Sequence, residues 1–348
     1  SDYIFDFRAW EFQHEYPTLW SEYEVEIPEY YDYVFLAQGY KSYHINTSKD
    51  GSRTYRIHRR RSEGLGSTND DIVLTGMAKM KRWVMKDVPA LKAESFVTTM
   101  ENYRSKIEFQ LSAVRYPNQP VQMVMESWPK VTENLMKSEA FGDAMQKAEG
   151  SLDEPLKPLM LTAKDPVQKA RLIFEYIRDN FTWNGYRGIY TSGSIKNLIK
   201  TKTGSVADIN LLLTATLKSM GFTAYPVILS TRDLGYTHEL YPLMDRFNYV
   251  ICAVLIGEED YLLDASDPDL GFGRLPNKCY NGHARVLTAD PLPIDLAADS
   301  LLEKKVTLAT IVASPVEIKG NVQSNLGYFG SSYYRNIVRQ KGQDALFN

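Results

Sequence analysis

The stretch Lys202-Thr-Gly-Ser-Val-Ala-Asp-Ile-Asn-Leu-Leu-Leu-Thr-Ala-Thr-Leu-Lys-Ser-Met-Gly221 decides the fold. It predicts a turn at Gly204, a buried helix, and a stop at Gly221, where a left-handed C-cap residue is expected. The segment 222–230 that follows has the composition of a strand entering a core. The apolar face of the helix is predicted at Leu211, Leu212, Ala215, Leu217 and Met220.

The composition of the chain limits its class. With 348 residues and 44% hydrophobic content, it is long enough for two or three packed domains. A net charge of −3 gives no general case for a nucleic-acid partner. No apolar run approaches the roughly 18 residues of a membrane span. Two cysteines, Cys252 and Cys279, allow one disulfide or two buried thiols. We expect a trimmed or mature fragment, because the chain opens in strand-like sequence.

Residues 1–127 are predicted to form a β-rich N-terminal domain, a sandwich or a large twisted sheet. The pattern indicates a hairpin of strands 40–44 and 53–59 around the turn-rich residues 48–52. It indicates two further paired strands over 97–104 and 107–114.

The remaining chain is predicted in three parts. Residues 128–164 are expected to hold a helix over 131–150 and a linker. Residues 165–290 are expected to form a core of helices followed by antiparallel strands, which makes the fold class α+β. Residues 291–348 are expected to be a β-rich region that ends in a helix and is cut short at Asn348.

Several motifs lie between Pro166 and Arg285: Trp183-Asn-Gly, Gly204-Ser-Val-Ala-Asp208, Gly221-Phe-Thr-Ala-Tyr-Pro-Val, Phe247-Asn-Tyr-Val, Tyr261-Leu-Leu-Asp-Ala-Ser and Phe272-Gly-Arg-Leu-Pro276. Together they resemble the bacterial transglutaminase-like family, whose relatives are papain-like cysteine enzymes. The resemblance implies a papain-like core flanked by β-rich domains. It also implies export from the cytoplasm, to the periplasm or outside the cell.

The family's chemistry needs a cysteine at a helix start, a histidine on the next strand and an aspartate on the following strand. The pattern maps these groups onto Val206, onto Tyr249 or Asn248, and onto Asp264. Valine cannot attack a carbonyl, and neither Tyr249 nor Asn248 is a base near neutral pH. The resemblance therefore implies a site whose cysteine and histidine are substituted.

Other side chains are candidates to replace the missing nucleophile and base. Ser205 lies one residue out of register, and His238 is predicted in an exposed loop. Cys279, with His283 four residues on, is the other possible nucleophile, whereas Cys252 has the surroundings of a core residue. Asp208 suits the first turn of its helix whether or not there is catalysis. No phosphate loop or zinc signature is present, so no cofactor and no metal are predicted.

Three hypotheses follow. The first is a non-catalytic module that binds or scaffolds a peptide, protein or glycan in a cleft. The second is an amide hydrolase of the cysteine-protease or transglutaminase type with a rearranged nucleophile. The third is a purely structural envelope protein. The cleft of the first hypothesis is predicted to draw on Trp183, Tyr186, Ser205, Asp208 and Asn248.

Overall fold

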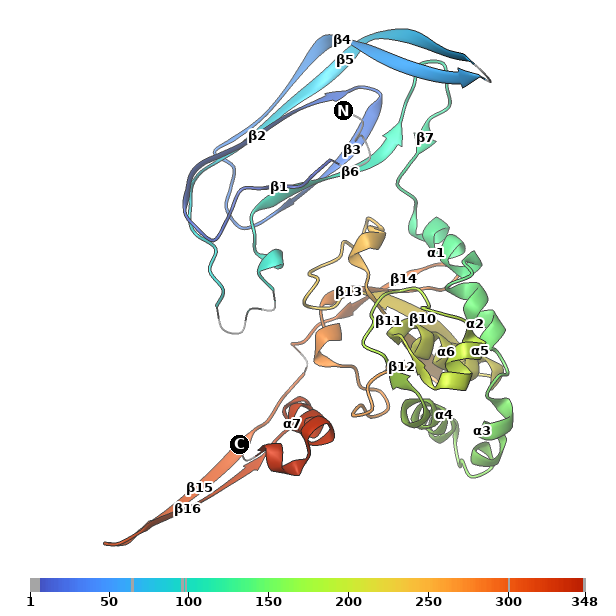
Figure 1. The fold of residues 1–348 in the computed structure, drawn as a ribbon, viewed down its shortest axis with the longest axis vertical. Coiled ribbons are helices and arrows are strands. Elements are labelled where there is room, and N and C mark those ends of the chain that lie inside the picture. The colour runs from blue at the N-terminus through green and yellow to red at the C-terminus, as the bar shows by residue number, and fades with distance from the viewer. Residues whose placement is uncertain (1–6, 64–65, 95–96, 98, 300, 347–348) are drawn as a thin grey trace. The chain divides into compact units, whose positions relative to one another are not determined.

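The computed structural model describes residues 7–63, 66–94, 97, 99–299 and 301–346. The chain divides into two compact units, residues 1–127 and 128–348 (Figure 1). Sheet and helix are mixed along the chain, which confirms the predicted α+β class with several β-sheets on either side of a helix-containing core. No helix in the described ranges is both long and apolar enough to cross a membrane.

The first unit is built from two antiparallel sheets. One sheet has the order β2-β5-β4, and the other has the order β1-β6-β3 with β7 paired to β6. Phe12, Trp83, Met85 and Ile107 form part of the core between them. The strands are β1 Trp10–Glu11, β2 Thr18–Pro28, β3 Tyr31–Gln38, β4 Ile45–Glu63, β5 Gly66–Val88, β6 Lys106–Val114 and β7 Gln122–Met123.

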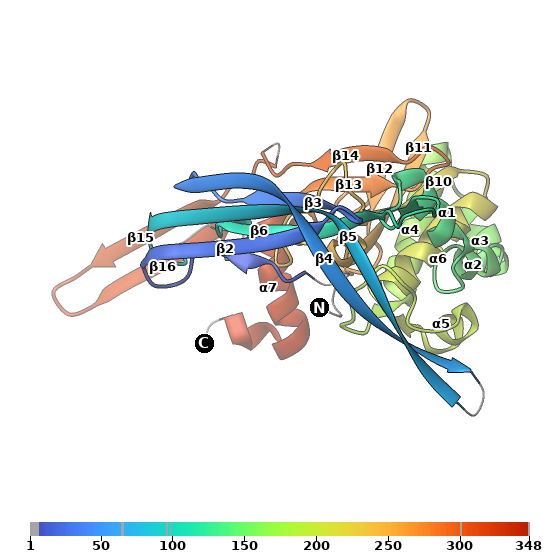
Figure 2. The same cartoon turned by 90° about the horizontal axis from the view of Figure 1, so that it is seen from above.

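Two strand predictions in this unit are wrong. The expected hairpin around residues 48–52 does not form, because β4 runs through it and pairs with β5 at every position, including Asp50 with Lys79 and Gly51 with Ala78. Pairing with a long partner strand outweighs the local turn preference of these residues. The two strands make the long twisted ribbon that Figure 2 shows. Over residues 97–104 the described backbone forms a short 3-10 turn, Met100–Asn102, and no strand.

The second unit has a five-stranded antiparallel sheet of order β12-β11-β10-β13-β14 (Figure 1). Helix α6 packs on β10 and β11, while α2, α4 and α5 pack on α6. A short parallel bridge joins β8 to β9 just before α6. The elements are α1 Trp128–Lys137, α2 Gly142–Ala148, α3 Asp153–Met160, α4 Pro166–Asn180, β8 Thr182–Trp183, α5 Ile195–Thr201, β9 Thr203–Gly204, α6 Val206–Ser219, β10 Thr223–Leu229, β11 Tyr249–Ile256, β12 Glu259–Leu263, β13 Gly282–Val286 and β14 Leu292–Leu296.

Helix α6 is the centre of this unit, as predicted. It starts with a capping box, in which the Ser205 hydroxyl accepts from the Asp208 N–H at 3.2 Å and the Asp208 carboxylate accepts from the Ser205 N–H at 2.7 Å. Residues 206–217 are all buried, so the helix has no solvent face over three turns. It ends before Gly221, whose φ of 87° is the left-handed conformation that glycine adopts without strain.

The segment 128–164 differs from its prediction, because it contains three helices in place of one helix and a linker. The predicted helix over 131–150 breaks after Lys137, where Phe141 turns into the core. Gly142 allows this turn: a Cβ there would lie 2.1 Å from the carbonyl oxygen of Met136. The expected linker is largely helix α3.

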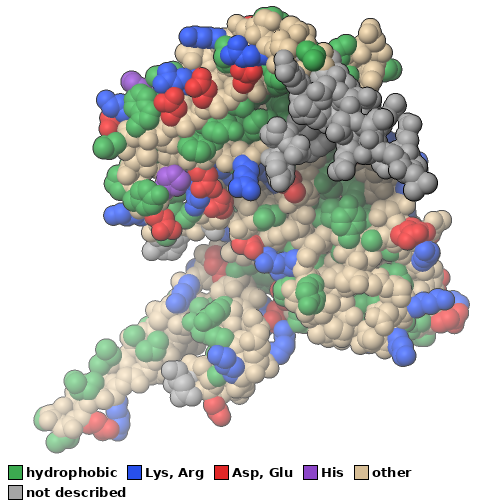
Figure 3. All heavy atoms as spheres, turned by 45° about the horizontal axis from the view of Figure 1, so that its top comes forward, with side chains coloured by type: hydrophobic (Ala, Val, Ile, Leu, Met, Phe, Trp, Pro, Cys, Tyr) green, Lys and Arg blue, Asp and Glu red, His purple; other side chains and the backbone are tan. Residues whose placement is uncertain are grey.

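The chain ends in a hairpin of β15 Val306–Ala313 and β16 Ile318–Asn325, followed by α7 Tyr328–Lys341. This agrees with the expected β-character and terminal helix. Leu308 and Ile311 lie exposed on this hairpin. Figure 3 shows hydrophobic side chains along its surface. Helix α7 contacts the loop 265–280, where its Tyr328 hydroxyl accepts from the Gly271 N–H at 2.7 Å and Arg335 and Arg339 pair with Asp269.

Candidate functional site

The three positions that the family pattern assigns to a catalytic triad lie in one buried region. Val206 is the first residue of α6, Tyr249 is the first residue of β11, and Asp264 directly follows β12. Val206 and Tyr249 belong to one apolar cluster, and all three side chains are fully buried. The Tyr249 hydroxyl donates to Asp264 Oδ2 at 2.8 Å.

Asp264 is held by a complete set of donors. Its Oδ1 accepts from Asn210 Nδ2 at 2.8 Å and from the N–H and hydroxyl of Ser266 at 2.9 and 2.6 Å. Both carboxylate oxygens therefore have partners, which is what keeps a buried carboxylate tolerable. The bonds connect α6, β11 and the turn after β12.

Asn210 is a central residue that the sequence analysis missed. Its amide nitrogen donates to Asp264 and to the Val250 carbonyl at 2.9 Å, and its Oδ1 accepts from the Ala265 N–H at 2.9 Å. The signal was present, because one asparagine interrupts the apolar run from Ile209 to Leu213. An amide on a helix that is buried all round must have buried partners.

Tyr249 is not a substitute base. Burial is the largest cause that raises its pKa, and the nearby negative charge of Asp264 raises it further. The phenol is therefore neutral at physiological pH and donates a hydrogen bond. Its hydroxyl lies 3.2 Å from the Ser266 hydroxyl, and its ring belongs to the same apolar cluster as Val206.

Ser205 and Asp208 cap the N-terminus of α6. Beyond their mutual capping bonds, Asp208 accepts from the N–H of Ser192 at 3.1 Å and from its hydroxyl. Ser205 is 3% exposed, and no histidine in the described part of the chain is hydrogen bonded to it. Asn248 faces a different neighbour: its amide accepts from the Thr231 N–H at 2.9 Å and donates to the Thr231 hydroxyl at 2.8 Å.

Both cysteines are buried free thiols. Cys279 lies in the cluster of Val206 and Tyr249, and burial, followed by the charge of Asp264, raises its pKa well above the ordinary value. Burial likewise raises the pKa of Cys252 to about 12. Both thiols are protonated at neutral pH, and a protonated thiol is a poor nucleophile.

The histidines considered for the site have other surroundings. The His283 ring lies on β13, 6.1 Å from the ring of Trp128 and 6.4 Å from that of Phe247. His238 accepts from the Leu240 N–H at 3.2 Å and lies beside Tyr241. Among the described residues, no group of three or more His, Cys, Asp or Glu side chains is arranged to hold a metal ion.

His283 should make the stability of the protein sensitive to mild acid. Burial, followed by the charge of Arg285, lowers its pKa from 6.5 to about 4. Since the unfolded chain binds the proton first, the stability present above pH 6.5 is lost as the pH falls towards 4. We expect a loss of about 1–2 kcal/mol between about pH 7.5 and about pH 5, allowing for the partial exposure of the ring. Urea melts at both pH values should show this loss, and His283→Gln should remove it. An equal pH dependence in the variant would contradict the assignment.

A cavity of about 250 Å³ lies beside the triad positions. Trp183, Ser266, Asp267 and Lys278 line one side of it, and residues of α7, including Tyr333, line the other. Trp183 is half-buried and packs against the cluster that contains Val206.

The cavity combines an aromatic wall with charge. The Lys278 ammonium lies 4.7 Å from the ring centroids of both Trp183 and Tyr249. Burial raises the pKa of Asp267. The Trp183 indole donates to the Tyr186 carbonyl at 2.8 Å, while the Tyr186 side chain is exposed and does not line this cavity.

Part of the second unit matches a known protein family. Residues 156–247, which include α6 and Val206, match the Transglutaminase-like superfamily. No curated protein matches the chain. A candidate protease from Parabacteroides distasonis ATCC 8503 is similar in structure, with 11% identity over 96% of this chain and 72% of its own and a TM-score of 0.47. A candidate cysteine protease from Cytophaga hutchinsonii has 11% identity over 88% of this chain and 93% of its own and a TM-score of 0.29. The chain thus carries a transglutaminase-like domain at residues 156–247.

Proposed function

We propose that the transglutaminase-like domain is non-catalytic and binds a peptide or glycan in the cavity beside its degenerate triad. The observation that carries this proposal is the environment of Val206. Its side chain is fully buried in the same apolar cluster as Tyr249, and the Tyr249 hydroxyl donates to Asp264. A nucleophile and a base are absent from the positions where this family's chemistry needs them.

The cavity supports a binding role over a purely structural one. A site that had filled with side chains would leave no hollow beside Trp183, whereas a hollow of about 250 Å³ remains there. An indole face, a lysine ammonium and the amides of Asn336 and Gln340 offer apolar contact and hydrogen bonds together. Such a mixture suits an extended peptide or a short glycan. The family resemblance adds the proposal that the protein works outside the cytoplasm, where peptidoglycan fragments are suitable ligands.

Titration of tryptophan fluorescence tests the proposal. We expect a saturable change when peptidoglycan fragments or mixed peptides are added to the wild type, because a ligand would desolvate Trp183. The change should disappear in Trp183→Phe and persist in Trp20→Phe, which removes an exposed tryptophan of the other unit.

Quenching by acrylamide tests the opposing hypothesis, in which the cavity is closed and the protein is purely structural. If no ligand changes the fluorescence and Trp183 is fully shielded from acrylamide, the cavity is closed in solution and the structural hypothesis replaces this one. Thiol-sensitive turnover of a peptide amide would favour the rearranged enzyme.

A further inference from the structure

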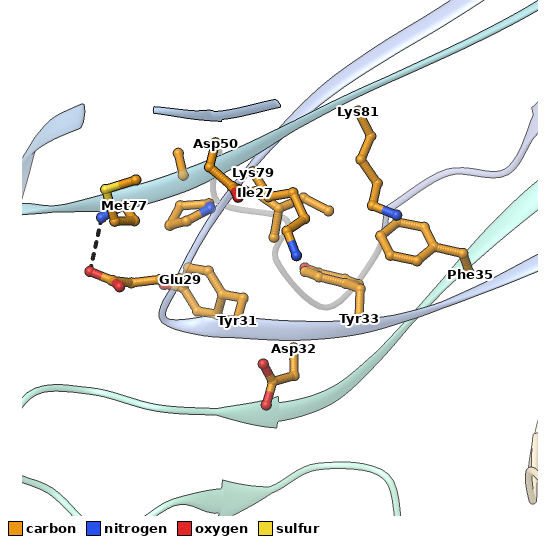
Figure 4. Close-up of a pocket in the computed structure, with 12 residues that line it drawn as sticks. Ile27, Glu29, Tyr31, Asp32, Tyr33, Phe35, Asp50, Met77, Lys79 and Lys81 are labelled. Atoms are coloured by element: carbon orange, nitrogen blue, oxygen red, sulfur yellow. Dashed lines mark hydrogen bonds between the residues drawn. The ribbon is translucent and has the colours of Figure 1, made fainter. Parts of the chain in front are cut away.

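The first unit contains a separate cavity of about 480 Å³ at one end of its two sheets (Figure 4). Tyr31, Tyr33 and Phe35 of β3 form its aromatic wall. Lys79 and Lys81 of β5 reach towards these rings from the facing strand. Its size lies within the range of small-molecule sites.

The two lysines lie on the face of β5 that carries core residues further along the strand. Side chains alternate along β5, so Lys79 and Lys81 point to the same side of the sheet as Trp83 and Met85, which are 4% and 1% exposed. Phe35 joins the two regions, because its ring lies 5.5 Å from that of Trp83. The cavity therefore lies next to the core of the unit, where Lys81 is half-buried and Lys79 is exposed.

Neither lysine is held in a close ion pair in the described part of the chain. The Lys81 ammonium lies 4.1 Å from the Phe35 centroid, and burial, followed by the charge of Lys79, lowers its pKa.

The acidic residues of the wall have other partners or positions. Asp32 pairs with Arg115 and points away from the lysines in Figure 4. Glu29 accepts from the Met77 N–H at 2.9 Å. Asp50 is the cross-strand neighbour of Lys79, at the rim formed by β4.

We propose that this cavity binds an acidic sugar, with its carboxylate between Lys79 and Lys81 and its ring against Tyr33 and Phe35. A carboxylate would neutralise two like charges that lie two residues apart on the same side of β5. The aromatic rings follow one another on one strand face and offer a flat apolar surface to the C–H face of a pyranose. The carboxylate of Asp50 also lines the cavity and can accept hydrogen bonds from the sugar hydroxyls. This site is independent of the cavity beside Trp183.

Calorimetric titration of the whole protein tests the proposal, with galacturonic acid, galactose and an acidic tripeptide of glutamate as probes. We expect galacturonate to bind, galactose to bind at least about tenfold more weakly, and added salt to weaken the interaction. Tighter binding of the tripeptide would overturn the sugar assignment, and an absence of galacturonate binding would overturn the site.

The test variant and its control both change lysines of β5. The double variant Lys79→Gln and Lys81→Gln should bind galacturonate at least about tenfold more weakly. Lys86→Gln, which is exposed outside the cavity on the same strand, should bind like the wild type. Circular dichroism melts establish that each variant is folded. Unchanged affinity in a folded double variant would contradict the proposal, and unchanged affinity in Trp183→Phe is expected because that residue belongs to the other cavity.

Discussion

Replacing Asn210 with alanine should lower the free energy of unfolding by about 3–5 kcal/mol. The amide makes three hydrogen bonds inside the core, to Asp264, Val250 and Ala265. Alanine would leave the Ala265 N–H and the Val250 carbonyl without these partners and would remove one donor from a fully buried carboxylate. No water reaches these groups to compensate, because Asn210 and Asp264 are both 0% exposed.

Asn197 offers the matched control for this experiment. It lies exposed on α5, where its side chain makes none of the buried contacts of Asn210. Asn197→Ala should change stability by less than about 0.5 kcal/mol in urea melts. If both variants lose the same small amount of unfolding free energy, the network around Asp264 does not hold α6 to the sheet.

Leu212→Ala should cost about 2–5 kcal/mol, because it removes a fully buried side chain from the middle of α6 and leaves a cavity. Lys218→Ala on the same helix should cost less than about 0.5 kcal/mol. Its ammonium is exposed and lies 3.7 Å from Glu149, a surface pair of little energy. Denaturant melts of the two variants measure the difference, and a small loss for Leu212→Ala would show that α6 is not central to the unit.

The parts of the fold that the sequence predicted well are those with local signals. Helix α6 has a capping serine, a carboxylate in its first turn and a glycine after its last turn, and these act through neighbouring residues alone. Helix α4 carries local signals of the same kind, with Asp165 as its cap and Pro166 at its first position.

The errors arose where distant residues decide the structure. Residues 48–52 resemble a turn, yet β5, some thirty residues away in the sequence, extends them as a strand. The break before α2 depends on the packing of Phe141 and on the close approach of Gly142 to Met136. Neither contact is visible in the periodicity of the segment.

In the candidate site, too, motifs in the sequence could be recognised, whereas contacts between distant segments could not. The family resemblance predicted Val206, Tyr249 or Asn248, and Asp264 as the triad positions, and the fold brings Val206, Tyr249 and Asp264 into one region. The resemblance did not identify Asn210 or Lys278, because their roles come from the approach of β11 and of the loop 265–280. The cavity in the first unit was also missed, since it depends on which face of β5 meets β3.

The central claim is that the transglutaminase-like domain has no working nucleophile, and covalent trapping tests it most directly. The native protein would be incubated with a peptidyl chloromethyl ketone and its intact mass measured. We predict no adduct on the native chain, and alkylation of Cys252 and Cys279 only after unfolding in denaturant, because both thiols are buried. An adduct on Cys279 or Ser205 of the native protein, lost in Cys279→Ala or Ser205→Ala, would contradict the account.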